Sequence, residues 1–114
     1  MTRLICWFLV SAMAVLTGMS AASAESRVAL VLGNAAYHHT SRLLNPVRDA
    51  EAMAIKLREL DFEVVTGFDL TTSETQARVA QFAREVRGAD IALFYYAGHA
   101  LQLSDANYLI PVNA

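Results

Sequence analysis

The stretch IALFYYAGH, residues 91–99, is an apolar run that stops abruptly at a glycine and a histidine. Runs that are apolar at every position are typical of strands buried on both faces of a parallel sheet, so we expect Ile91–Tyr96 to be a central strand. In an open α/β sheet, ligands bind in the crevice beyond the carboxyl ends of the strands. His99 is therefore a candidate for chemistry, although a lone histidine is more often structural than catalytic.

Three further segments have the composition of strands. Arg27–Gly33, with the sequence RVALVLG, is a continuous apolar run closed by the turn signal Gly33-Asn34. Phe62–Val65 is the next, and Asn107–Val112 is a short extended segment in which Pro111 indicates the edge or the end of a strand. Together with Ile91–Tyr96, these segments predict a mostly parallel sheet.

Two helices are predicted between these strands. The first begins after Asn45, a favourable N-cap, with Pro46 at the first helical position, and it ends at Asp61 in a left-handed conformation. The second opens at Thr71, whose spacing to Glu74 is that of a capping box. Apolar residues recur at spacings of three and four in both helices: Val47, Ala50, Met53, Ala54, Leu57 and Leu60 in the first, and Val79, Phe82, Ala83 and Val86 in the second.

The alternation of strand, helix, strand, helix and strand is the pattern of an α/β domain with a mostly parallel sheet. Residues 25–114 suffice for one small domain, and no repeat or linker indicates a second. After three or four strands, at least one sheet edge lacks an evident cover, and such edges pair readily with further chain. We therefore expect a partial domain that is incomplete at its C-terminus and has an open sheet edge.

The first 24 residues have the features of a secretory signal peptide. Met1–Arg3 is a short positive start, Leu4–Met19 is apolar, and Ala22-Ser23-Ala24 is a small-residue cleavage site. A membrane anchor is the alternative, but the apolar run is short for a span and is interrupted by polar residues and a glycine. We expect removal of residues 1–24 and an exported protein, periplasmic or secreted, without membrane contact after cleavage. Cys6, the only cysteine, lies in this segment, so residues 25–114 can form no disulfide.

Charge and composition argue against several classes of ligand. The net charge is -2, and the 9 lysines and arginines are scattered singly, so we expect no nucleic-acid partner. His38 and His39 have no third ligand at a recognised spacing, so we predict no metal site. Gly33 alone does not make a dinucleotide-binding motif, which needs several glycines and a later acidic residue, and we predict no cofactor.

Five segments, taken together and in this order, resemble the caspase-like cysteine peptidases, especially their bacterial metacaspase-like branch. They are RVALVLGNAAY from Arg27, LLNPVRDAEAMAIKL from Leu43, DFEVV from Asp61, DIALFYYAGHALQ from Asp90 and NYLIPVNA from Asn107. The resemblance covers nearly all of residues 25–114 and corresponds to the N-terminal, p20-type half of that catalytic domain. It implies a caspase-like three-layer α/β/α sandwich and a cysteine peptidase whose substrates are peptides or proteins.

The resemblance also implies roles for three consecutive residues. His99 matches the histidine that takes the proton of a cysteine thiol, and Gly98 lets the backbone turn so that the imidazole faces the crevice. The backbone N–H of Ala100 matches an oxyanion donor, but the family usually has glycine at this position, so we expect a strained backbone there. In the family the cysteine lies about 50 residues beyond the histidine, and residues 100–114 contain none. The chain by itself is therefore predicted not to hydrolyse peptides.

Substrate-binding residues are not assigned by the resemblance. Caspases that cleave after aspartate carry an arginine before the first helix, where this chain has Leu43. We therefore expect the basic preference of metacaspase-like enzymes rather than an acidic one. Asp105 is close in sequence to His99, but a solvated loop carboxylate is a simpler interpretation of it than a substrate contact.

Three functions remain open at this point. The first is the N-terminal part of an exported caspase-like endopeptidase that carries the catalytic His99 and lacks the cysteine nucleophile. The second is a non-catalytic caspase-like module that binds a partner, such as another caspase-fold chain, across its open sheet edge. The third is a small α/β binding domain unrelated to peptidases, in which His99 is structural.

Overall fold

The computed structural model describes residues 24–114. Its elements, in chain order, are β1 (Arg27–Gly33), α2 (Pro46–Glu59), β2 (Glu63–Phe68), α3 (Thr72–Glu85), β3 (Ile91–Ala97), β4 (Ala100–Leu103) and β5 (Ala106–Leu109). The predicted signal peptide and Cys6 lie outside the described residues, apart from Ala24 at the cleavage site. Within residues 24–114, no helix has the length and apolar character needed to cross a membrane.

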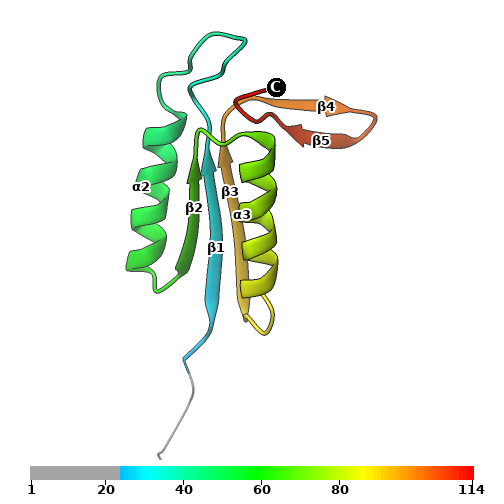
Figure 1. The fold of residues 1–114 in the computed structure, drawn as a ribbon. Helices are drawn as coiled ribbons and strands as arrows, with labels where there is room; N and C mark the ends of the chain where they lie inside the picture. The colour runs from blue at the N-terminus through cyan, green and yellow to red at the C-terminus, as the bar shows by residue number, and fades with distance from the viewer. Residues whose placement is uncertain (1–23) are drawn as a thin grey trace, which may run out of the picture.

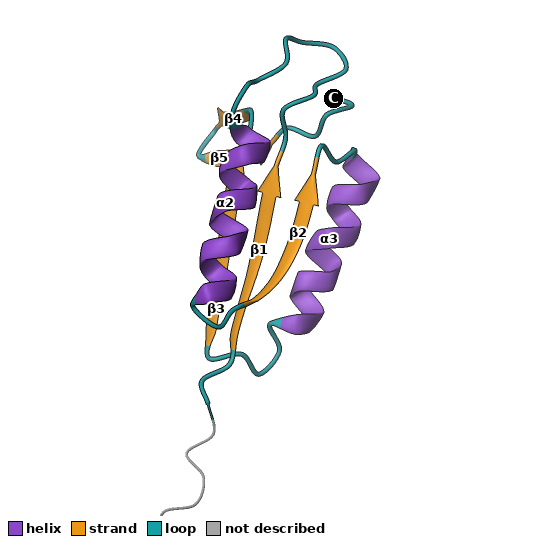
Figure 2. Ribbon diagram, turned by 90° about the vertical axis from the view of Figure 1, so that its left-hand side faces the viewer, coloured by secondary structure: helices purple, strands orange, loops and turns teal. Residues whose placement is uncertain are grey.

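The first three strands form one parallel sheet in the order β2-β1-β3. α2 packs on one face of this sheet and α3 on the other, so the molecule has three layers (Figures 1 and 2). The predicted α/β class and the α/β/α arrangement with a parallel sheet are confirmed. α2 follows β1 and α3 follows β2, and each helix returns the chain to the end of the sheet where the next strand begins, as parallel pairing requires.

The central strand is β1 and not β3, so the prediction of a central Ile91–Tyr96 strand is wrong for the sheet of residues 24–114. Residues 28–32 of β1 are at most 2% exposed, whereas Ile91 and Phe94 of β3 are 37% and 49% exposed. Phe94 pairs with Leu30 and so faces the α3 side of the sheet, but α3 packs over β1 and β2 only. An apolar run predicts burial without indicating how many neighbours a strand has.

The core is divided by the sheet into two clusters. Under α2, Ala29 and Val31 of β1 pack against Ala50, Ala54 and Leu57. Because two of the three helix residues are alanines, α2 approaches the sheet closely, and Ala50 and Ala54 are at most 1% exposed. The cluster on the α3 side contains Leu30, Leu32, Val65 and Leu70, with Phe82 of α3 packed against it.

The helix boundaries confirm three of the local predictions and correct a fourth. Thr71 caps α3, because its hydroxyl accepts from Glu74 N (3.4 Å), and Asp61 after α2 has a φ of 64°. Pro46 opens α2 as predicted, but the side chain of Asn45 makes no capping hydrogen bond. Asn45 has helical backbone angles (φ -110°, ψ -16°) rather than the extended angles that aim an N-cap side chain at the free N–H groups.

The two edges of the parallel sheet differ. On β2, the guanidinium Nε of Arg78 in α3 donates to the backbone oxygen of Thr66 (3.0 Å). That bond occupies an acceptor that a further strand would need, which is a recognised way of protecting an edge. β3 pairs only with β1 among residues 24–114, and the side chains of Ile91 and Phe94 remain exposed beside its edge. The open edge is therefore β3.

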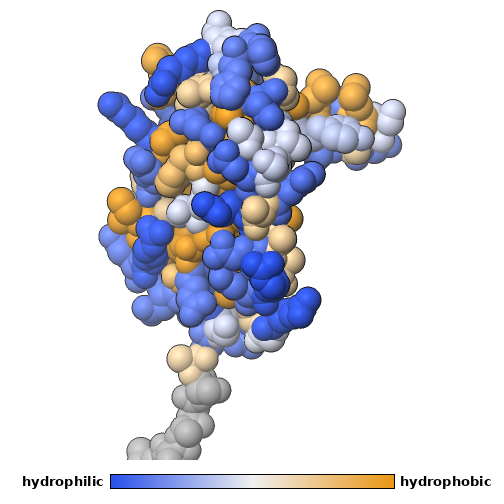
Figure 3. Space-filling view, in the orientation of Figure 1, coloured by the Kyte–Doolittle hydropathy of each residue, from blue (hydrophilic) through white to orange (hydrophobic). Residues whose placement is uncertain are grey.

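A second, antiparallel sheet consists of β4 and β5 alone. The prediction of a fourth strand over Asn107–Val112 is therefore corrected: its first part is β5 in a hairpin, and its last part returns across the end of the main sheet. Ser104 and Asp105 both have positive φ (48° and 67°), as the two central residues of a type I′ hairpin turn do. The hairpin projects from the molecule, and its apolar side chains are visible in Figure 3.

Candidate active site

The carboxyl end of the parallel sheet is where three separate segments of the chain meet. The loop after β1, the Gly98-His99 turn after β3 and the C-terminal segment from Ile110 lie together at this end (Figure 1). A backbone hydrogen bond from Asn34 N to Ala97 O (2.9 Å) joins the first two of them. His99 thus lies at the position where open α/β sheets bind ligands.

Gly98 has a backbone conformation and a close environment that require glycine. Its φ is 155°, and a Cβ at this position would lie 2.6 Å from the hydroxyl of Tyr96 and 2.8 Å from that of Tyr37. Any side chain would have to displace both hydroxyls. Gly98 therefore allows β3 to end in a tight turn against two tyrosines, with His99 directly after it.

The peptide groups of His99 are fully bonded, while its side chain is only partly buried. Its N–H donates to the Tyr37 hydroxyl (2.7 Å), and its carbonyl oxygen accepts from the Tyr96 hydroxyl (2.7 Å) and from Ile110 N (3.0 Å). The imidazole lies against the ring of Tyr37, with ring centroids 4.7 Å apart and planes at 48°. The backbone of His99 is thus held on both sides, and its imidazole on one face.

Ala100 begins β4 and lies opposite Leu109. Because Ile110 N donates to His99 O, Ala100 and Leu109 form a non-hydrogen-bonded pair of the antiparallel ladder, in which the N–H of Ala100 points away from β5. The expectation of strain is wrong, since the non-glycine residues with positive φ in the described part of the chain are Asp61, Asp69, Ser104 and Asp105. An alanine N–H is thus available next to His99 without backbone strain.

Two polar side chains hold this end of the sheet together. Asn34, 3% exposed, accepts from Leu70 N (3.1 Å) through its amide oxygen and donates to Ile110 O (3.2 Å) through its amide nitrogen. The carboxylate of Asp69 accepts from the backbone N–H groups of residues 35 and 36 (2.8 and 2.9 Å). Every one of these bonds links segments far apart in sequence, so the turn that carries His99 rests on a cross-linked frame.

The sequence pattern does not single out Asn34, Tyr37 or Asp69. Asn34 has the pattern of a turn signal beside Gly33, and the other two stand in polar connecting segments. A usable signal is the position of Asn34 directly after a fully apolar strand. A polar side chain buried there must find hydrogen-bond partners, and in a parallel sheet those partners are the neighbouring chain ends.

Tyr95 and Tyr96 point to opposite faces of β3, and both pack against the core. Tyr95 joins the cluster under α2, and Tyr96 the cluster on the α3 side. Burial raises the pKa of the Tyr96 hydroxyl well above its ordinary value of 10.0, and the hydrogen bond with Tyr37 adds to the shift. The hydroxyl of Tyr96 therefore remains a donor to His99 O and Ile110 O at neutral pH.

The raised pKa of Tyr96 predicts a loss of stability at alkaline pH. Above pH 10.0 the unfolded chain releases this proton while the folded chain keeps it, so the free energy of unfolding falls as the pH rises. We expect a smaller fall in Tyr96→Phe than in the unmodified chain, measured by urea unfolding from about pH 8 to about pH 12. Equal slopes in Tyr96→Phe and in the unmodified chain would contradict the prediction.

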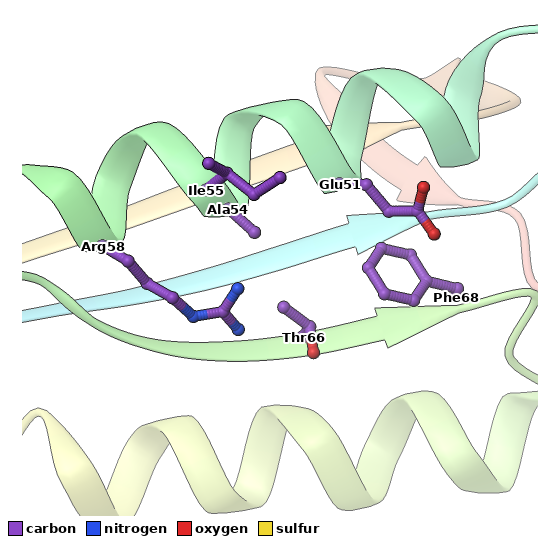
Figure 4. A pocket seen from close by; sticks show the side chains of 6 residues that line it. All are labelled: Glu51, Ala54, Ile55, Arg58, Thr66 and Phe68. Carbon is purple, nitrogen blue, oxygen red and sulfur yellow. The ribbon is translucent and has the colours of Figure 1, made fainter.

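A hollow of about 250 Å³ lies between α2 and β2 (Figure 4). Its lining residues are Glu51, Ala54, Ile55, Arg58, Thr66 and Phe68. None of them belongs to the group around His99, so this hollow is separate from the candidate site. Its walls are mostly apolar, with a carboxylate and a guanidinium among the lining side chains.

The other residues that the sequence analysis considered as metal ligands or substrate contacts do not join the group around His99. His38 and His39 are exposed, with ring centroids 6.3 Å apart and planes at 75°, and no group of three or more His, Cys, Asp or Glu suited to a metal occurs among residues 24–114. Asp105 is at the tip of the β4–β5 hairpin, and Leu43 lies in the loop before α2, where its N–H donates to Ala35 O (2.9 Å).

Comparison with known proteins identifies the family. The family model described as "Caspase domain" matches residues 26–114. The mucosa-associated lymphoid tissue lymphoma translocation protein 1 of Homo sapiens is 35% identical over 91 residues, which cover 80% of this chain and 11% of that protein. Its homolog in Mus musculus has the same identity and coverage, so the chain spans about a ninth of the length of these relatives. The chain belongs to the caspase domain family.

Proposed function

We propose that this chain is the histidine-bearing part of a caspase-like cysteine endopeptidase that cleaves peptide bonds in protein substrates. The observation that carries the proposal is the pairing of His99 with the unstrained, outward-pointing N–H of Ala100 at the carboxyl end of the sheet. A general base and an oxyanion donor on adjacent residues are what acyl transfer to a thiolate requires. Membership in the caspase domain family supports the same chemistry.

In this reaction each group has a separate task. The imidazole of His99 takes the proton of a cysteine thiol, and the thiolate attacks the scissile carbonyl carbon. The N–H of Ala100 donates to the oxyanion that forms on the carbonyl oxygen. The imidazolium of His99 then gives its proton to the leaving amine as the C–N bond breaks, which leaves the acyl group on the cysteine. Water, deprotonated by the same imidazole, attacks this thioester and releases the acyl group and the thiol. Gly98 contributes the turn that brings the imidazole to the sheet end.

The cysteine of this proposal comes from polypeptide outside the sequence, because residues 25–114 contain no cysteine. Export is part of the proposal as well. The charged start, the apolar run and Ala22-Ser23-Ala24 support a cleaved signal over residues 1–24 and a periplasmic or secreted protein. Assignment to the bacterial metacaspase-like branch, and with it a basic cleavage preference, stays a prediction.

The test is hydrolysis by the native protein isolated from its source, before and after alkylation of its thiols. We expect the native protein to cleave a fluorescently labelled unfolded protein substrate, and iodoacetamide to abolish this activity because the attacking thiolate is blocked. The recombinant 114-residue chain is the control and should be inactive with or without the reagent. Hydrolysis that survives alkylation, or a native protein that cleaves no substrate, would contradict the proposal.

The open β3 edge favours a second candidate, a non-catalytic module that pairs with another caspase-fold chain. Arg78 occupies an acceptor on the β2 edge, while β3 keeps its free side and exposed Ile91 and Phe94. An added strand would satisfy the β3 backbone and cover these side chains. This candidate takes the lead if the native protein forms a stoichiometric complex with such a chain and shows no thiol-dependent hydrolysis.

A further inference from the structure

His99 is the only residue in the site whose backbone donor and backbone acceptor are both bonded to tyrosine hydroxyls in the described part of the chain. Tyr37, in the loop after β1, receives the His99 N–H at 2.7 Å. Tyr96, in β3, donates to the His99 carbonyl oxygen, also at 2.7 Å. The two hydroxyls are 3.3 Å from each other, within hydrogen-bond range.

The number of protons fixes the direction of these bonds. Each tyrosine hydroxyl has one proton to donate and can accept through its oxygen. The proton of Tyr96 is directed to His99 O at 2.7 Å, with Ile110 O at 3.2 Å as its weaker alternative. Tyr96 therefore accepts in its contact with Tyr37, and Tyr37 donates. The bonds run in one sense, from His99 N–H to Tyr37, from Tyr37 to Tyr96, and from Tyr96 back to His99 C=O.

We propose that Tyr37 and Tyr96 are positioning residues that close a hydrogen-bonded ring through the backbone of His99 and so hold its imidazole at the sheet end. The ring joins the loop after β1 to the end of β3, because the two tyrosines are 59 positions apart in the sequence. Neither hydroxyl is directed at the imidazole nitrogens. Their effect on chemistry is therefore indirect, through the peptide that carries the side chain.

The environment makes these bonds persistent. Tyr37 is 8% exposed, so water competes weakly for its hydroxyl, and its ring is packed against the imidazole at a centroid distance of 4.7 Å. Burial keeps Tyr96 protonated, as its raised pKa indicates, so the donor in the last bond is not lost. The backbone N–H of Ile110, at the base of the hairpin, is a second donor to the His99 carbonyl oxygen (3.0 Å).

The ring also accounts for the residue between Tyr96 and His99. A Cβ on Gly98 would lie 2.6 Å from the Tyr96 hydroxyl and 2.8 Å from the Tyr37 hydroxyl, too close to both. The ring and a side chain at this position cannot exist together without displacement of the tyrosines. Gly98, Tyr37 and Tyr96 therefore depend on one another structurally, although Tyr37 is far from the other two in the sequence.

The test is amide hydrogen exchange of the full 114-residue chain, observed by NMR. In Tyr37→Phe the aromatic side chain still packs against the imidazole, but the hydroxyl that accepts from His99 N–H is removed. We therefore expect the His99 amide to exchange at least about fivefold faster. The amide of Val31 in β1 should keep its rate, which shows that the fold is intact. Tyr95→Phe, on the opposite face of β3, is the matched control and should change neither rate.

A measurement on the unmodified chain keeps the test decisive if the variant fails to fold. We expect two slowly exchanging tyrosine hydroxyl protons at low temperature, one of them with a nuclear Overhauser contact to the His99 amide proton. An unchanged His99 exchange rate in a folded Tyr37→Phe chain would overturn the proposal. Rapidly exchanging hydroxyl protons in the unmodified chain would overturn it as well.

The catalytic consequence of the ring rests on the proposed function and is measured separately. In the native peptidase, Tyr37→Phe should lower kcat by about 10²-fold or less and leave KM nearly unchanged, because a misplaced base affects the transition state and not substrate binding. If the native protein proves inactive, the proposed function fails while the exchange result stands. If activity is present and both kcat and exchange are unaffected by Tyr37→Phe, the positioning role fails and the proposed function stands.

Discussion

Replacing His99 by alanine should lower the rate of peptide hydrolysis by the native protein about 10²- to 10⁴-fold, the usual contribution of a general base. The fold should survive, because the hydrogen bonds that His99 makes in the structure all use its backbone N–H and carbonyl, which alanine retains. What the substitution removes is the imidazole and its contact with the ring of Tyr37. The measurement is kcat/KM with a peptide substrate, alongside urea unfolding of both proteins.

The matched control for this prediction is His39→Ala. His39 is exposed in the loop after β1 and has no place in the candidate site. Its replacement should change kcat/KM by less than about twofold, since surface substitutions away from special features have small effects. Full activity of folded His99→Ala would remove His99 from the mechanism and leave it a structural residue.

Replacing Gly98 by alanine should destabilise the chain by more than about 3 kcal/mol, from backbone strain and from the loss of tyrosine hydrogen bonds. The new Cβ would need to occupy space 2.6 Å from one hydroxyl and 2.8 Å from the other. Tyr37 is 8% exposed and cannot swing into solvent without opening the core at this end. The free energy of unfolding from urea titration, with near-ultraviolet circular dichroism of the tyrosines, measures the effect.

Gly88→Ala is the control that separates backbone strain from steric contact of the new Cβ with neighbouring atoms. Gly88 also has a positive φ, of 76°, but a Cβ there would meet nothing within 4 Å. Its replacement should cost about 1 kcal/mol, the penalty of a left-handed conformation for a residue with a side chain. If both alanine variants lose the same stability, the two tyrosine hydroxyls do not restrict residue 98, and the ring around it is looser than the distances indicate.

Much of the parallel sandwich follows from local sequence patterns. Residues 28–33 are apolar at every position and buried, and the Thr71 hydroxyl caps the second helix by accepting from Glu74 N. Asp61 ends the first helix in a left-handed conformation, as its short polar side chain allows. These features depend on residues close in sequence, so periodicity and capping chemistry are sufficient to find them.

Strand order and the hairpin could not be found in this way. β1 and β3 are both apolar runs, and only their long-range pairing decides that β1 has two neighbours. The Ser104-Asp105 turn lacks the glycine that marks most type I′ hairpins, so the pattern around it suggests a loop. Asn45 shows the converse case, in which a favourable capping residue is present and its side chain makes no cap.

The candidate site divides in the same manner. The position of His99 could be predicted because a histidine directly after a buried strand of an α/β sheet lies at the carboxyl end of the sheet. Besides the nearby Tyr96, the contacts that hold it come from Tyr37, 62 positions away, and from the segment at Ile110. Such contacts follow from tertiary packing and leave no periodic signal, so a single sequence does not reveal them.

The anchoring of the hairpin at its base has a consequence for how this region can change during evolution or engineering. His99 O accepts from Ile110 N, and two residues later Val112 is 2% exposed and donates to Leu70 O, so the chain leaves and re-enters the body at fixed points. The turn at Ser104 and Asp105 lies at the far end of β4 and β5 from these points. Extra residues inserted at this tip would lengthen the β4–β5 hairpin without moving its base. The hairpin can therefore gain length and exposed surface while the residues around His99 keep their geometry.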